Sequence, residues 1–325
     1  MLYEQNLEEL IFNRHEMIES DELIVLSGYL GPRPVGRLQE LPFTTTVIYG
    51  MYGDKGIQNK LHNALLQHQH DIDNINIFYS NIPIHSKCYI WKYKNQVKHA
   101  LIGSANFSIN GLTTPYREVL AETTKDTFKP LNDYINRIMN HSTLCTDIIL
   151  PSNKIILNSD ASSSEFCKVS LLDNNGNIQN ASGLNWGYEK NGKKSKKRKE
   201  DDACLVIRQH HLENYPSLFP PIQDYSPIII RGARSQRKND KVEIIWDDKT
   251  IMDGLLEGSQ ERNGIKYPKN FSSSPKKDII GKYIRKRLGV GFGEKVTKGD
   301  LEKYGRTDID VSLLDEGVYY FDFSV

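Results

Sequence analysis

The chain has 325 residues, of which 38% are hydrophobic, 26% are charged and 10% are aromatic, and its formal net charge is +1. This composition is typical of a folded protein with one large domain or two domains, and it excludes global disorder. The apolar runs are too short to cross a bilayer, so no membrane partner is expected. The first twelve residues contain three glutamates and no basic residue, unlike a signal peptide, and we expect a soluble cytoplasmic protein.

Charge and histidine content separate the chain into two chemically different parts. Residues 1–164 carry 14 Lys/Arg and 17 Asp/Glu, residues 165–325 carry 28 and 24, and seven of the nine histidines lie in the first part. No two of the four cysteines lie within twenty residues of each other, which argues against zinc ribbons and a disulfide framework. We expect one domain over 1–150, a linker over 151–164 and a second domain over 165–325.

The first domain alternates short apolar runs with helical patterns, which indicates an α/β layered domain. Residues 57–68, for example, place Ile57, Leu61, Ala64 and Leu65 at helical spacing. The predicted strands are 22–30, 44–52, 76–79, 84–91, 99–102 and 118–121, and the predicted helices are 57–68 and 128–139.

The second domain follows a serine-rich stretch and has a different texture. Short β-rich runs are separated by turn residues, which predicts a β-barrel-like domain with a few helices. Its predicted strands are 167–172, 204–208, 227–231, 242–246 and 317–323, and one predicted helix is 279–288.

The most informative segment runs from His85 to Glu118. Side chains alternate faces along a strand, so His85 and Lys87 share a face and place an imidazole beside a cation. The next predicted strand leads into Ser104 and Asn106, polar residues at a turn that could cap a following helix and bind phosphate. Glu118 could then orient a histidine.

These residues resemble the phospholipase D superfamily, whose motif is HxK followed by GSxN. Here the motif reads His85-Ser86-Lys87 and Gly103-Ser104-Ala105-Asn106, and Glu118 matches the glutamate of the nuclease branch. The family motif also has an aspartate five residues after the lysine, where this chain has Lys92. This departure favours a phosphodiesterase over a lipid-active phospholipase.

The resemblance implies a mixed sheet flanked by helices and a phosphodiesterase that needs no metal and no cofactor. The family uses two HxK motifs per site and this chain has one, which implies a homodimer through the N-terminal domain. One His85 would form a phosphohistidine and the second chain's His85 would protonate the leaving oxygen. Lys87, Ser104 and Asn106 would hold the phosphate, and Glu118 would orient the imidazole.

The second domain contains a strongly basic run. Six of the ten residues 191–200 are Lys or Arg, and Trp186 and Tyr188 lie just before them. Such a loop suits a phosphate backbone. A nuclear localisation signal and a solvated loop are the alternatives that the composition leaves open.

The second domain also resembles the C-terminal B3-like DNA-recognition domain of phospholipase D-type restriction endonucleases, the BfiI and NgoFVII group. The matching pieces are GLNWG at 183–187, FPP at 219–221, the stretch 246–258, and YPKNFSS followed by a helix ending at 287–289. The resemblance implies two arms that grip double-stranded DNA, at 188–199 and 257–269. The residues expected to contact DNA are Trp186, Tyr188, Lys193, Lys194, Lys196, Lys197, Arg198, Arg208, Arg231, Arg234, Gln260, Arg262, Asn263, Lys266 and Lys269.

The leading interpretation is a type II-like restriction endonuclease that cuts outside a short site read by its C-terminal domain. One alternative is a DNA-binding regulator with a degenerate phosphodiesterase dimerisation domain. Another is a nuclease subunit that needs a helicase-like NTPase partner, since this chain has no GxxxxGKS or GxxxxGKT motif. A lipid phosphodiesterase and a metal nuclease built around Glu243, Asp247 and Asp248 are less favoured.

Overall fold

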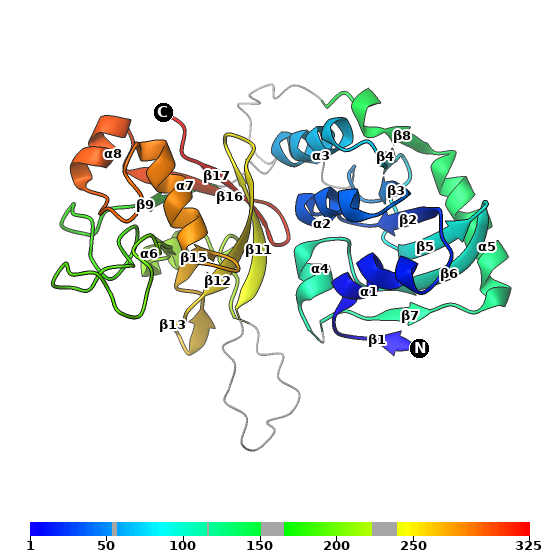
Figure 1. The fold of residues 1–325 in the computed structure, drawn as a ribbon, viewed down its shortest axis with the longest axis horizontal. Helices are drawn as coiled ribbons and strands as arrows, with labels where there is room; N and C mark the ends of the chain where they lie inside the picture. The colour runs from blue at the N-terminus through cyan, green and yellow to red at the C-terminus, as the bar shows by residue number, and fades with distance from the viewer. Residues whose placement is uncertain (54–56, 116, 151–165, 223–238) are drawn as a thin grey trace, which may run out of the picture. The chain divides into compact units, whose positions relative to one another are not determined.

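The computed structural model describes residues 1–53, 57–115, 117–150, 166–222 and 239–325 (Figure 1). The chain divides into two compact units, Met1–Ala161 and Ser162–Val325, here called the N-terminal and C-terminal units. The expected linker at 151–164 and the expected strand at 227–231 lie outside the described residues.

The N-terminal unit is built on an eight-stranded mixed sheet in the order β1-β7-β6-β5-β2-β3-β4-β8. Strands β2, β3 and β4 are parallel, and the other pairings are antiparallel. The strands are β1 (Leu2–Tyr3), β2 (Glu22–Ser27), β3 (Thr44–Tyr49), β4 (Ile75–Ser80), β5 (Lys87–Tyr93), β6 (Gln96–Gly103), β7 (Leu120–Glu122) and β8 (Ser142–Leu144).

Helices cover both faces of this sheet. Helix α5 (Lys125–Met139) lies on one face, and α1 (Leu7–Asn13), α2 (Pro32–Arg37), α3 (Asn59–Asp71) and α4 (Ile109–Thr113) lie on the other (Figure 1). Ile135 and Ile138 of α5 pack with Ile24, Leu26 and Ile90 of the sheet. Alternation then directs the odd-numbered side chains of β2 and β5 toward the helices of the opposite face.

The strand directions bring several loops to one edge of the sheet. The carboxyl ends of β2, β3 and β4 share an edge because these strands are parallel, and β5 begins there because it is antiparallel to β2. The predicted strand at 84–91 begins later, at Lys87, so His85 lies in the loop before β5. This loop and the turn after β2 therefore meet at the edge.

Helix α2 was not predicted, because Pro32, Pro34 and two glycines suggested a loop. Both prolines lie in the first turn of the helix, where a missing amide N–H costs no hydrogen bond. The helix connects the parallel strands β2 and β3.

The C-terminal unit is a seven-stranded sheet in the order β10-β15-β12-β11-β17-β16-β9. The edge strands β10 and β9 approach each other, so the sheet curls into a nearly closed barrel. Its strands are β9 (Phe166–Ser170), β10 (Leu205–Val206), β11 (Asp240–Trp246), β12 (Ile251–Glu257), β15 (Asn270–Ser273), β16 (Asp308–Asp315) and β17 (Val318–Asp322). Trp246, Phe271 and Phe321 pack in its core.

Within its described residues, the C-terminal unit also contains three helices and one hairpin. The helices are α6 (Gln209–Asn214), α7 (Asp278–Leu288) and α8 (Lys298–Tyr304), and the hairpin joins β13 (Gln260–Arg262) to β14 (Ile265–Tyr267). Asn263 and Gly264 both have positive φ at the hairpin turn, as a two-residue turn of this kind requires. Helix α7 ends at Gly289, which is left-handed.

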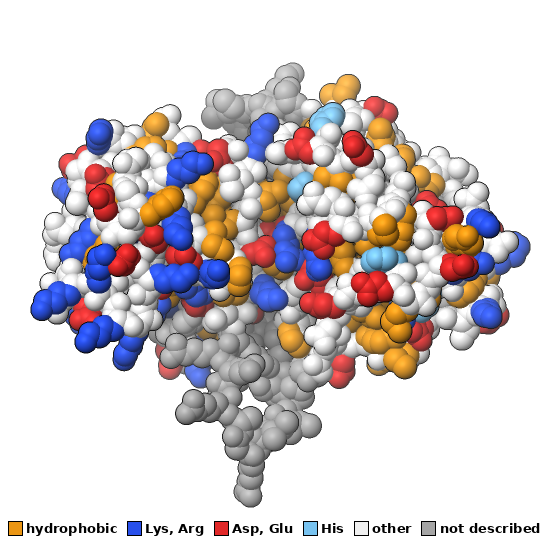
Figure 2. Space-filling model, viewed as in Figure 1, with side chains coloured by type: hydrophobic (Ala, Val, Ile, Leu, Met, Phe, Trp, Pro, Cys, Tyr) orange, Lys and Arg blue, Asp and Glu red, His pale blue; other side chains and the backbone are white. Residues whose placement is uncertain are grey.

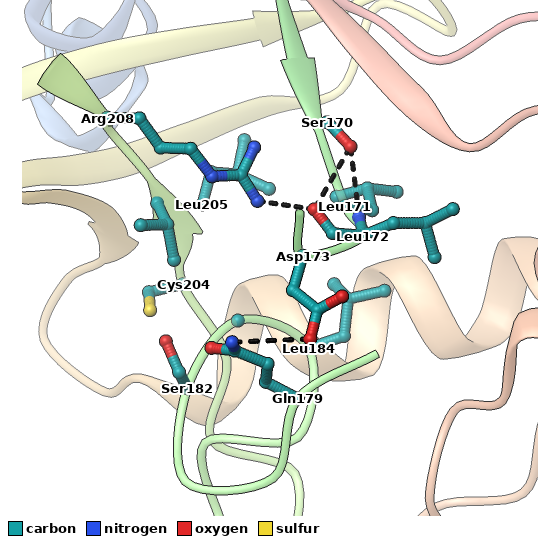
Figure 3. A pocket seen from close by; sticks show the side chains of 12 residues that line it. Ser170, Leu171, Leu172, Asp173, Gln179, Ser182, Leu184, Cys204, Leu205 and Arg208 are labelled. Atoms are coloured by element: carbon teal, nitrogen blue, oxygen red, sulfur yellow. Dashed lines mark hydrogen bonds between the residues drawn. The ribbon is translucent and has the colours of Figure 1, made fainter. Parts of the chain in front are cut away.

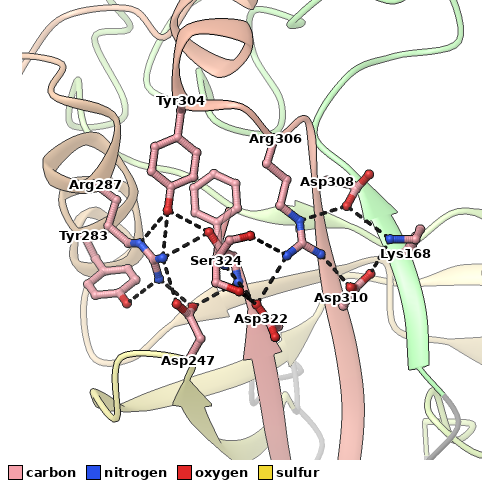
Figure 4. Close-up of polar contacts among 11 residues, drawn as sticks. Lys168, Asp247, Tyr283, Arg287, Tyr304, Arg306, Asp308, Asp310, Asp322 and Ser324 are labelled. Carbon is pink, nitrogen blue, oxygen red and sulfur yellow. Dashed lines mark hydrogen bonds and ion pairs between the residues drawn. The ribbon is translucent and has the colours of Figure 1, made fainter.

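Ion pairs hold the C-terminal strands to α7 and to one another (Figure 4). Arg287 Nη1 and Nη2 donate to the two carboxylate oxygens of Asp247 at 2.6 and 2.8 Å. Arg306 pairs with Asp308, Asp310 and Asp322 on the neighbouring strands. Asp247, which had been considered as a metal-nuclease carboxylate, therefore has a structural partner.

Candidate active site and DNA-binding surface

His85 and Lys87 contact each other at the edge of the N-terminal sheet. Lys87 Nζ lies 2.8 Å from His85 Nδ1 and also donates to the main-chain oxygen of His85. Ser86, between them, faces the other side of the sheet, with Oγ 2.7 Å from Tyr134 Oη of α5. A charged ammonium can only donate, so this contact places the proton of a neutral imidazole on Nε2.

Lys87 is a buried cation, with only 4% of the residue exposed. Burial lowers the pKa of Lys87, and the negative charge of Glu118 acts in the opposite direction. Tyr89, on the same face of β5, is fully buried and donates from Oη to the main-chain oxygen of Ala105 at 2.8 Å. This bond ties β5 to the turn that carries Asn106.

Asn106 and Ser104 lie on that turn in different surroundings. Asn106 Oδ1 accepts a hydrogen bond from the Tyr29 N–H at 3.2 Å. Ser104 is exposed, and its Oγ accepts from the Val119 N–H at 3.1 Å. Neither residue caps the following helix; Ser108 does, by accepting from the Gly111 N–H.

His85, Lys87 and Asn106 converge on Gly28, in the turn after β2. A Cβ added to Gly28 would lie 3.4 Å from Lys87 Nζ, 3.4 Å from Asn106 Oδ1 and 3.5 Å from His85 Cα. The structure thus places the Lys87 ammonium, the Asn106 amide oxygen and the main chain of His85 around the point where a side chain at residue 28 would begin.

The negative charge of Glu118 acts on Lys87, whose pKa it raises. Its Oε1 lies 3.8 Å from Arg117 Nε, and its charge acts on Lys87 and Tyr89. Among the described residues no hydrogen bond joins Glu118 to His85. The imidazole of His85 contacts Lys87 Nζ and the ring of Tyr29.

The first arm of the C-terminal unit is an exposed, cation-rich loop. Lys and Arg side chains gather over this unit in Figure 2, and Lys193, Lys194, Lys196, Lys197 and Arg198 are all exposed. The Arg198 guanidinium lies 3.7 Å from the ring centre of Trp186, a cation–π contact. Lys194 Nζ pairs with Glu200 at 2.6 Å.

Tyr188 has a structural environment in the same arm. It is only 5% exposed and donates from Oη to the Gly293 main-chain oxygen at 2.6 Å. Its side chain therefore anchors the base of the arm.

An open hollow of about 310 Å³ adjoins the first arm. Residues 196–199 line it together with Lys276 and Lys277, which precede α7, and with Asp202 and Asp278. Sequence reasoning did not select Lys276 and Lys277, since a lysine pair before a helix is common; their adjacency to the arm depends on the fold.

The second arm is the β13–β14 hairpin. Gln260 Nε2 donates to the main-chain oxygens of Ile207 and Pro268 at 2.9 and 2.8 Å, so both of its amide hydrogens are in use. Arg262 pairs with Glu213 at 3.3 Å. Asn263 lies at the turn, and Lys266 and Lys269 are exposed.

Arg208 lines two hollows of the C-terminal unit, and Figure 3 shows the smaller one. Its Nη2 donates to the Leu172 main-chain oxygen. Asp173, Gln179 and Arg208 line both hollows, and the larger one, of about 270 Å³, also contains Asn174 and Asn175. These amides were missed because loop 173–179 reads from sequence as an ordinary turn.

Two of the expected DNA-contacting residues are not placed by the structure, and its described part contains neither a candidate metal cluster nor a helix able to cross a membrane. Arg231 and Arg234 lie outside the described residues. Within the described ranges, no group of three His, Cys, Asp or Glu side chains could hold a metal ion. In the same ranges, no helix has the length and apolar character needed to cross a membrane.

Two family models match the chain, one for each unit. Residues 5–150 match the NgoFVII restriction endonuclease N-terminal PLD domain, where PLD denotes phospholipase D. Residues 160–315 match the NgoFVII C-terminal B3-like DNA-binding domain. Both expected fold classes are confirmed by these matches. No curated protein matches the chain.

Solved structures with a similar chain path cover less than half of this chain. NucT from Helicobacter pylori is 16% identical, with 44% of this chain and 97% of that chain covered and a TM-score of 0.34. Nuc from Salmonella typhimurium, a phospholipase D family member, is 15% identical, with 42% and 88% covered and a TM-score of 0.30. Polyphosphate kinase from Porphyromonas gingivalis is 13% identical, with 43% and 21% covered and a TM-score of 0.29. Likenesses at these TM-scores carry no argument about function.

Proposed function

Because the chain belongs to the NgoFVII restriction endonuclease family through both of its domains, we propose that it cleaves DNA with His85 as the nucleophile, without a metal ion. The observation that carries the proposal is the convergence of His85, Lys87 and Asn106 on Gly28 within the matched N-terminal domain. An imidazole, a cation and an amide suit attack on a phosphate and binding of its oxygens.

Lys87 and Asn106 stabilise the negative charge of the phosphate. Lys87 is buried beside the imidazole, so its ammonium acts at short range with little screening by water. Burial lowers the Lys87 pKa and Glu118 counteracts this effect, which favours the charged form that the phosphate needs. Ser104, exposed at the same turn, donates a third hydrogen bond to the phosphate.

The reaction proceeds in two displacements. Phosphate binding draws the Lys87 ammonium away from Nδ1, the imidazole proton then lies on Nδ1 toward Glu118, and the Nε2 lone pair attacks phosphorus. The P–O bond to the leaving strand breaks as a second histidine donates a proton to that oxygen. Water then attacks the phosphohistidine, gives its proton to the second histidine and releases His85.

The second histidine comes from a second copy of the chain. One chain has a single HxK motif, so a nucleophile and a general acid on opposite sides of phosphorus require two copies related by a two-fold axis. The proposed enzyme is therefore a homodimer through its N-terminal domain.

The C-terminal domain reads the target site in double-stranded DNA. Exposed lysines of the first arm suit the phosphate backbone, while Arg208 and the amides beside it are residue types that bind base edges. Because the reading domain is separate from the cutting domain, we expect cleavage outside the recognised sequence.

The test is plasmid cleavage by the purified full chain in EDTA, with His85→Ala and the matched control His70→Ala. His70 is exposed in the last turn of α3. Cleavage to discrete fragments by the wild type and His70→Ala, but not by His85→Ala, is the expected result. Cleavage that survives His85→Ala contradicts the proposed nucleophile.

Mixing experiments test the dimer. Excess His85→Ala chain should inhibit the wild type, because mixed dimers contain only one imidazole per site. Unchanged wild-type activity together with a monomeric sedimentation coefficient contradicts the shared site. DNA binding without cleavage by the wild type points instead to a regulator, unless adding a helicase-like NTPase restores cleavage.

A further inference from the structure

The turn after β2 contains three residues, Ser27, Gly28 and Tyr29, that belong to neither the HxK nor the GSxN motif. Ser27 ends β2 and its side chain is completely buried. The turn lies next to both motifs because β2 pairs with β5 and because the Leu30 segment bridges to Phe107.

Gly28 has no side chain at the point on which the proposed catalytic residues converge. A Cβ there would lie at 3.4–3.5 Å from Lys87 Nζ, Asn106 Oδ1 and His85 Cα. These are ordinary van der Waals distances, so the fold can accept a methyl group at this position. The methyl group would nevertheless lie between the Lys87 ammonium and the Asn106 amide oxygen.

The main chain of Tyr29 sets the orientation of the Asn106 carboxamide. The Tyr29 N–H can only donate, so the Asn106 atom 3.2 Å away must be the oxygen, Oδ1. Nδ2 then points away from this N–H, and among the described residues it makes no hydrogen bond. Both of its hydrogens are available to a phosphate oxygen.

Ser27 ties this turn to the turn that carries Asn106. Its Oγ donates to the Tyr29 main-chain oxygen at 2.6 Å and accepts from the Phe107 N–H at 2.9 Å. Asn106 Oδ1 lies 3.4 Å from the same hydroxyl. The hydroxyl thus holds the residue that orients Asn106 and the residue that follows Asn106.

The Tyr29 ring also contacts the nucleophile. Its centre lies 5.9 Å from the centre of the His85 ring, and the two planes meet at 81°. Such an edge-to-face contact restricts rotation of the imidazole.

We infer that Ser27, Gly28 and Tyr29 form a third element of the phosphate site, in which Gly28 keeps the space for the phosphate open and Ser27 positions Asn106 through the Tyr29 and Phe107 main chain. This inference rests on the proposed function. It assigns Ser27 and Tyr29 as positioning residues and Gly28 as a residue whose missing side chain the substrate requires.

The experiment uses the full chain in EDTA, with bis(4-nitrophenyl) phosphate as the substrate and inorganic phosphate as a competing ligand. This small diester requires no DNA recognition. Gly28→Ala should raise KM and the phosphate Kd together by about tenfold or more, since one charge-assisted contact is displaced. Its thermal midpoint should remain near that of the wild type. Unchanged KM and phosphate Kd in Gly28→Ala overturn the inference.

Ser27→Ala should lower kcat and weaken phosphate binding, and Ser80→Ala is the matched control. Ser80 is also buried in the same sheet, but among the described residues its hydroxyl bonds to the Ile82 main chain and to no part of the site. A double-mutant cycle distinguishes positioning from general destabilisation: Ser27→Ala should cause no further loss of phosphate affinity in an Asn106→Ala background. An additive loss overturns the positioning role.

Phosphate binding separates this inference from the proposed function. A wild type that binds phosphate but never hydrolyses the diester contradicts the proposed reaction, and the variants then test the inference through Kd alone. A wild type that neither binds phosphate nor hydrolyses the diester overturns both.

Discussion

The two candidate functional regions of this protein are constructed in opposite ways. In the N-terminal domain Lys87 is buried, and Asn106 and His85 are held by neighbouring strands and turns. In the C-terminal domain the cations lie exposed on a loop, and two of them, Lys194 and Lys199, form ion pairs with acidic neighbours. Attack on one phosphorus atom needs groups fixed in advance, whereas attraction of a phosphate backbone acts over several ångströms and tolerates motion.

The sharpest test of this contrast removes the buried cation. Lys87→Met keeps the length of the side chain and should reduce DNA cleavage by about 10³-fold, as for the loss of a preorganised charge in other active sites. Folding stability should not fall, because burial of the charge is itself unfavourable. Cleavage rates and urea unfolding of this variant, beside exposed Lys129→Met on α5, measure both effects.

If Lys87→Met greatly lowers the free energy of unfolding but hardly changes the cleavage rate, the proposed catalytic role of the buried cation is wrong. That result would make Lys87 a structural cation rather than a phosphate ligand.

Gln260 tests whether every polar residue of the second arm faces DNA. Gln260→Ala leaves two buried main-chain oxygens with fewer donors, so the free energy of unfolding should fall by about 2 kcal/mol. The base preference of the remaining folded protein should be unchanged. Urea unfolding and sequencing of bound duplexes from a random pool measure the two quantities.

Gln96→Ala is the control, since Gln96 is exposed at the start of β6 and its loss should leave both quantities unchanged. If Gln260→Ala keeps its stability and instead changes the selected sequence, Gln260 reads a base and the structural assignment is wrong.

The exposed lysines of the first arm should act additively and without sequence preference. Replacing Lys196 and Lys197 together with alanine should weaken DNA binding by about tenfold at moderate salt and reduce the salt slope by about two. Fluorescence anisotropy across a salt series measures this, with Lys168→Ala as the control because Lys168 pairs with Asp310 on the barrel. A changed base preference would assign these lysines to direct reading.

Lowering the pH should reduce the free energy of unfolding of both domains by similar amounts, which are smaller than the effects above. Burial lowers the pKa of His99 to about 4 and that of His211 to about 4, aided by nearby positive charge in each case. Between the ordinary value of 6.5 and about 4, the unfolded state binds a proton that the folded state does not, so stability falls as pH falls. Each histidine should contribute a loss of about 1 kcal/mol between pH 7 and pH 5.5.

Urea unfolding at several pH values measures this slope in the wild type and in His211→Asn, whose amide oxygen replaces Nδ1 as the acceptor for the Arg208 N–H. Exposed His70→Asn leaves His211 and its charged neighbours in place and should keep the wild-type slope. An unchanged slope in His211→Asn would mean that this histidine binds its proton over the same pH range in the folded and unfolded states, which contradicts the lowered pKa.

Most strands, and the order of the HxK and GSxN motifs along the chain, were predictable from sequence. The predicted strands at 44–52, 76–79, 99–102 and 242–246 are present with shifted ends, because alternation and β-branched content are local properties. Helix α2 was missed because its two prolines mark a turn as readily as the first turn of a helix.

The sequence alone identified the groups that we propose for the chemistry, since HxK and GSxN each lie within four consecutive residues. Only the tertiary structure decided that Gly28 and Ser27 join them, that Tyr188 and Gln260 are used to hold loops, and that Lys276 and Lys277 adjoin the first arm. The physical reason is that such contacts join residues far apart in the chain through strand order and packing, which local periodicity does not encode.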